Sequence, residues 1–226
     1  MTPEAAFIQS MFSIADKKGN DVDFDLNKAQ LELDENLTGR DIIPKARQLG
    51  ISAYFLGRYT ASCVMNRNTR AVVISHDVES TQRMLHKVHY MIKTMKGGPP
   101  NVDHMSKSEI TFPDTNSMFY IGTAGSRKFG RGDTITHLHC SEYALWDNPM
   151  VLFTGLAQAV PIGGEIAIES TGNGVGNDYH RRCIRAMEGN SQYKVHFFPW
   201  TYDPEYSFDL SHDEEVRLLN NLSEEL

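Results

Sequence analysis

The residues best suited to chemistry lie in a loop that reads Lys45-Ala-Arg-Gln-Leu-Gly50-Ile-Ser52. In the phosphate-binding pattern GxxxxGK[ST], backbone N–H groups cradle phosphates, a lysine reaches their oxygens and a hydroxyl contacts Mg²⁺. Gly50 and Ser52 occupy the second glycine and the hydroxyl positions. Ile51 replaces the usual lysine, and Lys45 stands at the first position instead. Because such a loop curls around the phosphates, a lysine from its far end can reach the same oxygens. The loop indicates a phosphate site; the alternative is an ordinary polar strand–helix loop.

A second candidate is an acid at the end of an apolar strand, in Ile135-Thr-His-Leu-His-Cys-Ser141-Glu142. Nucleotide-hydrolysing folds place such an acid beside the phosphate loop, where it orients water and meets the metal. The usual aspartate–glutamate pair is Ser141-Glu142 here, which makes Glu142 the candidate general base. Ser141 could hold Mg²⁺ only through water or as a neutral hydroxyl. An ordinary strand-terminal glutamate is the alternative.

A third candidate is the turn after the apolar strand 165–170, which carries Ser170, Thr171 and Asn173. A turn at the carboxyl end of a strand faces the crevice where ligands bind in open α/β sheets. Small hydroxyl and amide side chains there can sense a γ-phosphate and pass its loss to the next element. The alternative is a plain glycine-rich turn.

The elements that must position these residues alternate between apolar β-rich runs and helical patterns. This alternation predicts an α/β fold with a mostly parallel sheet flanked by helices. A loop rich in glycine and arginine spans residues 125–133. The expected strands are 41–44, 69–76, 109–112, 117–123, 134–141, 165–170 and 193–200, and the expected helices are 52–65, 79–95, 148–160, 178–187 and 213–226.

Composition restricts the classes of protein that the chain can represent. Its 226 residues suit one large α/β domain with a small appended subdomain. The formal net charge of −7 counts against a protein that grips DNA over a broad basic surface. Any DNA contact should therefore be local, transient or built by several subunits together. No apolar run approaches the ~18 residues of a membrane span. We also expect no signal peptide, and hence a cytosolic protein.

The cysteines and strand histidines are expected to be structural. Cys63, Cys140 and Cys183 lie far apart without zinc spacing, so we expect buried free thiols. His137 and His139 share one face of the predicted strand while Cys140 faces the other way, which argues against a metal cluster.

Taken together, the three candidate elements resemble the large terminase subunits of tailed phages in order and spacing. That family often moves the lysine to the first loop position, as at Lys45. It commonly follows the strand-end acid with an apolar, aromatic run, as in Ser141-Glu-Tyr-Ala-Leu-Trp146, and its coupling motif looks like Glu169-Ser-Thr-Gly-Asn-Gly174. Segments similar to the family's flanking motifs are Phe24-Asp-Leu-Asn27-Lys-Ala-Gln30, Phe197-Phe-Pro-Trp200 and Asp203-Pro-Glu-Tyr206.

The resemblance implies a fold and a function. The fold is a P-loop NTPase domain of the RecA/ASCE type over residues 1–210, with the start of a lid or linker helix at 211–226. The family's nuclease domain is expected to be absent from this chain. The implied activity is ATP hydrolysis that drives double-stranded DNA into a procapsid in the host cytoplasm. The implied partners are the portal protein, the small terminase subunit and further copies in a ring, with a monomer in isolation and no membrane contact.

The resemblance also implies residue roles. Asn27 and Gln30 would read the adenine or position the loop, and Arg47 would sense the γ-phosphate in cis. Arg131 would be an arginine finger, with Arg127 as the rival. Ser52 and Glu142 would bind Mg²⁺. Ser170, Thr171 and Asn173 would form the coupling motif. The whole ATP-binding set is Asn27, Gln30, Lys45, Ala46, Arg47, Gln48, Leu49, Gly50, Ile51 and Ser52.

Two departures from the family pattern leave alternatives open. Ile51 and Ser141 leave few ligands for the metal, so slow hydrolysis by the isolated domain is expected. A nucleotide-binding scaffold without hydrolysis is one alternative. A helicase or remodeller of the same P-loop class is the other, although a second RecA-like domain does not fit after Trp200.

Overall fold

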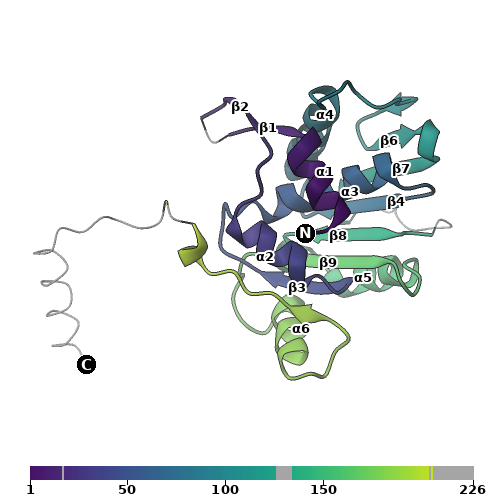
Figure 1. The fold of residues 1–226 in the computed structure, drawn as a ribbon. Helices are drawn as coiled ribbons and strands as arrows, with labels where there is room; N and C mark the ends of the chain where they lie inside the picture. Colours follow the sequence, from purple (N-terminus) through teal and green to yellow (C-terminus); the bar gives the residue numbers. More distant parts are fainter. Residues whose placement is uncertain (17, 126–133, 204, 206–226) are drawn as a thin grey trace, which may run out of the picture.

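The computed structural model describes residues 1–16, 18–125, 134–203 and 205. Within these residues the main sheet has eight strands in the order β10-β3-β9-β8-β4-β7-β6-β5 (Figure 1). A separate two-stranded sheet pairs β1 with β2. The strands are β1 (Ser13–Ala15), β2 (Asp21–Asp23), β3 (Arg40–Pro44), β4 (Arg70–Ser75), β5 (His104–Met105), β6 (Glu109–Phe112), β7 (Ser117–Thr123), β8 (His137–Ser141), β9 (Glu165–Ser170) and β10 (Lys194–Val195).

From β10 to β7 every neighbouring pair of strands is parallel, and the two pairings at the other edge, β7 with β6 and β6 with β5, are antiparallel. The predicted α/β class with a mostly parallel sheet is confirmed. Because parallel strands end at the same edge of a sheet, the loops after β3, β8 and β9 lie side by side. The α-helices are α1 (Pro3–Met11), α2 (Lys28–Asn36), α3 (Ile51–Met65), α4 (Val78–Lys93), α5 (Pro149–Gln158) and α6 (Asp178–Met187).

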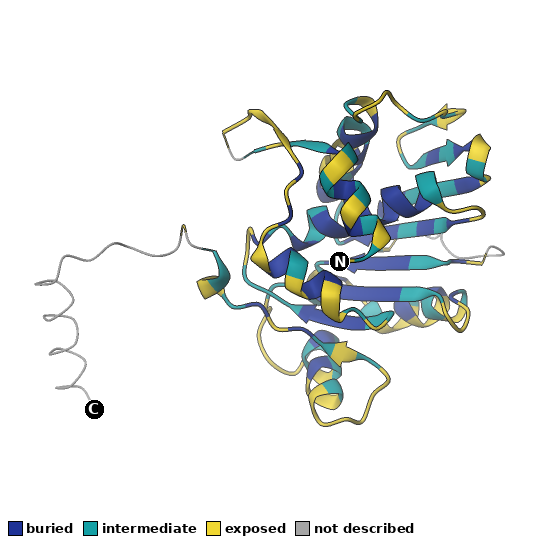
Figure 2. Ribbon diagram, viewed as in Figure 1, coloured by how far each residue is buried: buried dark blue, intermediate teal, exposed yellow. Residues whose placement is uncertain are grey.

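The helices cover both faces of the sheet. One apolar cluster joins α1, α2, α3 and α4 to residues such as Ile43 and Val73, and a second joins α5 and α6 to residues such as Ile42 and Ile74. Side chains along each strand therefore alternate between two cores, as expected for a sheet covered on both sides. Figure 2 shows the buried strands between partly exposed helices.

Helix α3 lies at the centre of the first core. Most of its residues are buried, including Tyr54, Phe55 and Tyr59. A Cβ atom at Gly57 would lie 3.2 Å from Phe24 and 3.3 Å from Ile8, so the absent side chain allows this close packing. Helix α3 therefore begins at a fixed place beneath the loop that precedes it.

The structure differs from the sequence prediction in several elements. Helices α1 and α2 were not predicted, nor were β1, β2 and the edge strand β5. Helix α2 has only nine residues and buries Gln30 and Asp34 beside Ala29 and Leu33, so it lacks a clean apolar periodicity.

The predicted strand at 193–200 was too long, because regular pairing covers only Lys194–Val195. Phe198 makes one isolated bridge to Lys45, and Pro199 then leads into the 3₁₀ helix Trp200–Tyr202. Proline offers no N–H to a ladder, which ends the pairing. The expected strand 134–141 likewise begins only at His137. The helix expected at 213–226 lies outside the described residues.

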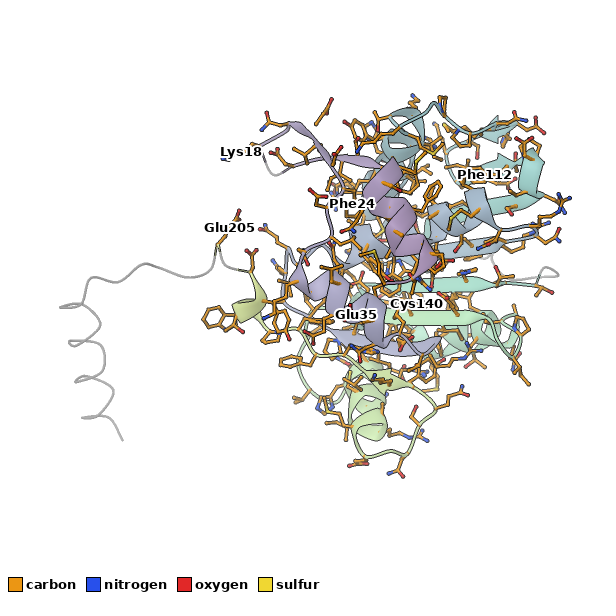
Figure 3. The ribbon with its side chains drawn as sticks, viewed as in Figure 1. Lys18, Phe24, Glu35, Phe112, Cys140 and Glu205 are labelled. Carbon is orange, nitrogen blue, oxygen red and sulfur yellow. The ribbon has the colours of Figure 1, made fainter. Side chains whose placement is uncertain are left out.

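The three cysteines are free and buried, which confirms their prediction as buried thiols. In Figure 3, Cys140 lies on β8 in the middle of the molecule, among the side chains that pack against the sheet. Across the described parts of the chain, no helix has the length and apolar character needed to span a bilayer.

Candidate active site

Three neighbouring strands bring the three sequence motifs together. Strand β9 lies between β3 and β8, with Pro44 paired to Ser170 and Ser141 paired to Glu169. The loop at 45–52, the acid Glu142 and the turn after Ser170 therefore meet at the carboxyl edge of the sheet. This is the place where ligands bind in open α/β sheets.

The loop at 45–52 is held from outside by helix α2. Asn27 caps α2 and donates from Nδ2 to the Leu49 carbonyl over 3.0 Å. Gln30 donates from Nε2 to the Gly50 carbonyl over 2.8 Å. Of the two roles predicted for Asn27 and Gln30, these contacts match the positioning of the loop.

The loop ends in a conformation that suits an anion. Gly50 has φ +73°, and it precedes α3 without a side-chain cap. The first N–H groups of a helix have no partner within the helix, so they favour a negatively charged ligand. Ile51, which stands at the usual lysine position, is buried in the core. The backbone N–H of Ala46 is already engaged by the Phe198 carbonyl.

Lys45 lies between two carboxylates. Its Nζ is 2.9 Å from Oε1 of Glu142 and 3.1 Å from Oε2 of Glu169. Burial disfavours the ammonium, but the charges of Glu169 and Glu142 outweigh burial and raise the pKa of Lys45. Lys45 therefore stays protonated and is poised at the mouth of the loop.

Glu169 is fully buried at the centre of this cluster. Its Oε1 accepts hydrogen bonds from Ser52 Oγ and Ser141 Oγ, both over 2.7 Å. Burial opposes its charge, but the ammonium of Lys45, together with His139 and the Ser141 hydroxyl, holds the pKa of Glu169 well below its usual range. Glu169 is therefore an ionised carboxylate beneath the site; from the sequence it was named only as the first residue of the coupling motif, without a role of its own.

Glu142 is held by the turn that follows β9. Its Oε2 accepts from the Thr171 N–H over 3.1 Å, from Thr171 Oγ1 over 3.2 Å and from Ser170 Oγ over 3.3 Å. Glu142 itself has φ +49°, a left-handed conformation that is uncommon outside glycine. Asn173 donates to the Ala144 carbonyl over 2.9 Å. The three predicted coupling residues thus contact Glu142 and the segment that follows it.

A cavity of about 410 Å³ opens over this cluster. Cationic side chains line it from two elements: Lys45 and Arg47 from the loop, and Arg83 and Lys87 from α4. Burial and the neighbouring Arg83 lower the pKa of Lys87. This lining suits a polyanion such as a triphosphate.

Arg83 and Lys87 were not predicted from the sequence. They lie one turn apart on the polar side of α4, which begins just after the central strand β4. The sequence signal that could have identified them is a pair of cationic residues four apart on the helix that follows a buried strand.

The remaining predicted residues fall into three groups. Gln48 lines the cavity and Leu49 packs into the core. Arg127 and Arg131 lie outside the described residues. His137 and His139 pack against Tyr59 and Phe55, and among the described residues no group of three His, Cys, Asp or Glu side chains could hold a metal ion.

The parallel sheet, the loop after β3 and the acid after β8 define the class: an α/β fold of the P-loop NTPase type. The particular fold is that of the ATPase domain of phage large terminases. The Thermus phage P74-26 large terminase ATPase domain matches with a TM-score of 0.68 at 15% identity, over 85% of this chain and 92% of that chain.

Two further structures share the fold. The HK97 bacteriophage large terminase matches with a TM-score of 0.67 at 17% identity, over 99% of this chain and 52% of that one. The large terminase of a thermophilic bacteriophage, in complex with ADP, matches with a TM-score of 0.60 at 14% identity, over 85% of this chain and 49% of that one. No family model and no curated protein matches the chain.

Proposed function

We propose that this chain binds ATP in the cavity at the carboxyl edge of the sheet and hydrolyses it. The observation that carries the proposal is the arrangement of Lys45, Glu142 and the 45–52 loop around a cavity lined by cations. The likeness in fold to terminase ATPase domains supports it, as does the ADP complex among those structures.

The residues present fit a magnesium nucleotide. Ser52 lines the cavity, and Glu142, whose side chain is partly exposed, lines it as well. Mg²⁺ commonly takes one or two protein ligands and completes its shell with phosphate oxygens and water. Ser52 would contact the ion directly and Glu142 through water. When bound, the ion neutralises charge on the β- and γ-phosphates.

The chain's own residues then divide the work. Lys45 moves from Glu142 to the phosphate oxygens, and Arg47 senses the γ-phosphate. The released carboxylate of Glu142, still held by Thr171, orients a water molecule and accepts its proton. The water oxygen bonds to the γ-phosphorus while the bond to the β–γ bridging oxygen breaks, and ADP leaves with that electron pair.

The direct test compares steady-state phosphate release by the wild type and Glu142→Gln. We expect the variant to bind ATP normally and to hydrolyse it about 10²–10⁴-fold more slowly, because a positioned base usually contributes a factor of this size. The amide keeps most of the hydrogen-bond geometry with Thr171 but cannot accept the proton. Wild-type turnover by Glu142→Gln would remove Glu142 from the mechanism.

We further propose that hydrolysis drives double-stranded DNA into a procapsid, in the host cytoplasm, as part of a ring of copies on a portal protein with a small terminase subunit. The fold supports a motor of this kind. The net charge of −7 fits a DNA contact shared among subunits. Arg131, or Arg127 in its place, would complete the site as an arginine finger.

Two outcomes would redirect the proposal. Unwinding of a forked duplex, rather than DNA-stimulated turnover on intact duplex, would favour a helicase or remodeller. Tight ATP binding without phosphate release, with or without DNA, would favour the nucleotide-binding scaffold suggested by Ile51 and Ser141.

A further inference from the structure

The acid that is missing from the end of β8 has a counterpart on the next strand. Ser141 stands where nucleotide-hydrolysing folds usually carry an aspartate, and its side chain is fully buried. Its pairing partner across the sheet is Glu169 on β9. The Ser141 hydroxyl donates to Glu169 Oε1 over 2.7 Å. The carboxylate is thus present in the same row of the sheet, one strand over.

The same carboxylate oxygen also accepts a hydrogen bond from the Ser52 hydroxyl, over 2.7 Å. A serine hydroxyl has one proton and two lone pairs. With its proton committed to Glu169, Ser52 can offer only lone pairs to the cavity that it lines beside Lys45. An oxygen fixed in this way is a ligand for a cation and not a donor to phosphate.

We propose that Glu169 is the positioning carboxylate of the magnesium site: by accepting a hydrogen bond from the Ser52 hydroxyl, it orients the Ser52 oxygen toward the cation and replaces the acid that β8 lacks. This inference rests on the proposed binding of magnesium nucleotide. Glu169 acts through Ser52 and need not touch the metal, because outer-shell partners of this kind fix the orientation and basicity of the ligand.

The charges around Glu169 favour this role. Among the described residues its Oε2 accepts no hydrogen bond, and Lys45 meets its charge at 3.1 Å. A buried carboxylate without a partner is costly. When Lys45 turns to the phosphates, a cation beside Ser52 restores positive charge close to Glu169. The cation would therefore replace the charge of Lys45 beside Glu169 when nucleotide binds.

The test measures how magnesium changes nucleotide affinity, with a fluorescent ATP analogue titrated into the chain in Mg²⁺ or in EDTA. In the wild type we expect Mg²⁺ to tighten binding. In Glu169→Gln the increase in affinity caused by Mg²⁺ should be about 10–100-fold smaller, which is the usual effect of removing a residue that orients a metal ligand. Its affinity in EDTA should equal or exceed the wild type, because Lys45 is then free for the phosphates.

Three further variants sharpen the result. Ser52→Ala should lose the same magnesium dependence, and combining it with Glu169→Gln should add no further loss. The double change Ser141→Asp with Glu169→Gln moves the carboxylate to β8 and should restore the dependence. Glu165→Gln is the matched control, because Glu165 lies on the same strand but pairs with Arg58 at the far end.

Several outcomes would overturn the role of Glu169. Unchanged magnesium dependence in Glu169→Gln is one, and equal weakening with and without Mg²⁺, as expected of a purely structural residue, is another. If Glu169→Gln does not fold, Glu169→Asp keeps the charge but withdraws it from Ser52, and full magnesium dependence there would refute the proposal. A wild type that binds no nucleotide would overturn both proposals, whereas binding without hydrolysis would overturn only the proposed activity.

Discussion

At the scale of single residues, Lys45 is the group on which the site depends. It lies between Glu142 and Glu169, with 6% of its side chain exposed. Without it, Glu142 and Glu169 would lose the ammonium group that both contact. In the proposed mechanism the lysine therefore has two roles: it binds phosphate when nucleotide is present, and it neutralises the two acids when nucleotide is absent.

Lys45→Ala should therefore eliminate turnover and also destabilise the fold. Removing one partner of a buried ion pair costs about 3–5 kcal/mol, which would appear as a lower melting temperature. Adding Ile51→Lys should not rescue turnover, because the Ile51 side chain points into the core. Lys93→Ala, an exposed change on α4, is the control. Normal hydrolysis by Lys45→Ala would mean that the phosphates are held elsewhere.

Glu169 gives the stability of the fold a predictable dependence on pH. Its pKa is lowered on folding from an ordinary value of 4.5, so the folded state binds fewer protons than the unfolded state in acid. The stabilisation is fully present above pH 4.5 and is lost as pH falls below this value toward the lowered pKa. Chemical denaturation between pH 7 and pH 3 should show a steeper loss of unfolding free energy in the wild type than in Glu169→Gln. Parallel curves would mean that folding does not lower the pKa of Glu169.

At the scale of elements, helix α2 and the loop at 45–52 form one unit. The residues that cap α2, Asn27 and Gln30, also donate to the Leu49 and Gly50 carbonyls. These two hydrogen bonds hold the end of the loop against α2. The start of α3 is thereby fixed relative to the acids of β8 and β9.

Gly50→Ala tests this unit. Gly50 has φ +73°, and an added Cβ would lie 2.6 Å from Nε2 of Gln30. The left-handed backbone costs about 1–2 kcal/mol for other residues, and displacement of Gln30 costs a hydrogen bond of about 1 kcal/mol. We expect a loss of roughly 2–3 kcal/mol in unfolding free energy and weaker nucleotide binding.

The matched control is Gly155→Ala on α5, where no atom of the described residues lies within 4 Å of the added Cβ atom. This change should be neutral or stabilising by up to about 1 kcal/mol, because alanine favours a helix. Equal effects of the two substitutions would show that the conformation of Gly50 is unimportant.

At the scale of the whole molecule, the proposed motor must order its hydrolysis around a ring. One way is for each subunit to complete its neighbour's site with a residue in trans. A guanidinium suits this role, because it is always charged and forks onto phosphate oxygens. Arg131 is the candidate for this role, with Gly130 and Gly132 on either side of it in the sequence, and it lies outside the described residues.

We therefore expect turnover per subunit to rise with protein concentration, and Arg131→Ala to remove that rise with ATP affinity nearly unchanged. A finger contributes about 10³–10⁵ in rate. Mixing Arg131→Ala with Glu142→Gln subunits should recover activity, because each variant keeps the half-site that the other lacks. No recovery in an assembled ring would mean that the arginine acts in cis, or that Arg127 or Arg47 takes its place.

Much of this architecture could be predicted from the sequence because its signals are local. Apolar runs between turns placed the strands 109–112, 117–123 and 165–170 at the bounds that the structure has. The alternation of strands and helices predicted the parallel sheet, and with it the meeting of three motifs at one edge. The loop at 45–52 and the acid Glu142 were likewise identified from patterns of a few residues, and their roles stay predictions.

Only the tertiary structure decided how these motifs share their charges. Glu169 lies 28 residues from Ser141 and 117 from Ser52, yet one of its oxygens accepts from both. Arg83 and Lys87 reach the cavity from another helix. Such contacts depend on which strands are neighbours and on which face of the sheet each side chain points to. Both follow from how the whole chain packs its two cores, so no local pattern in the sequence specifies them.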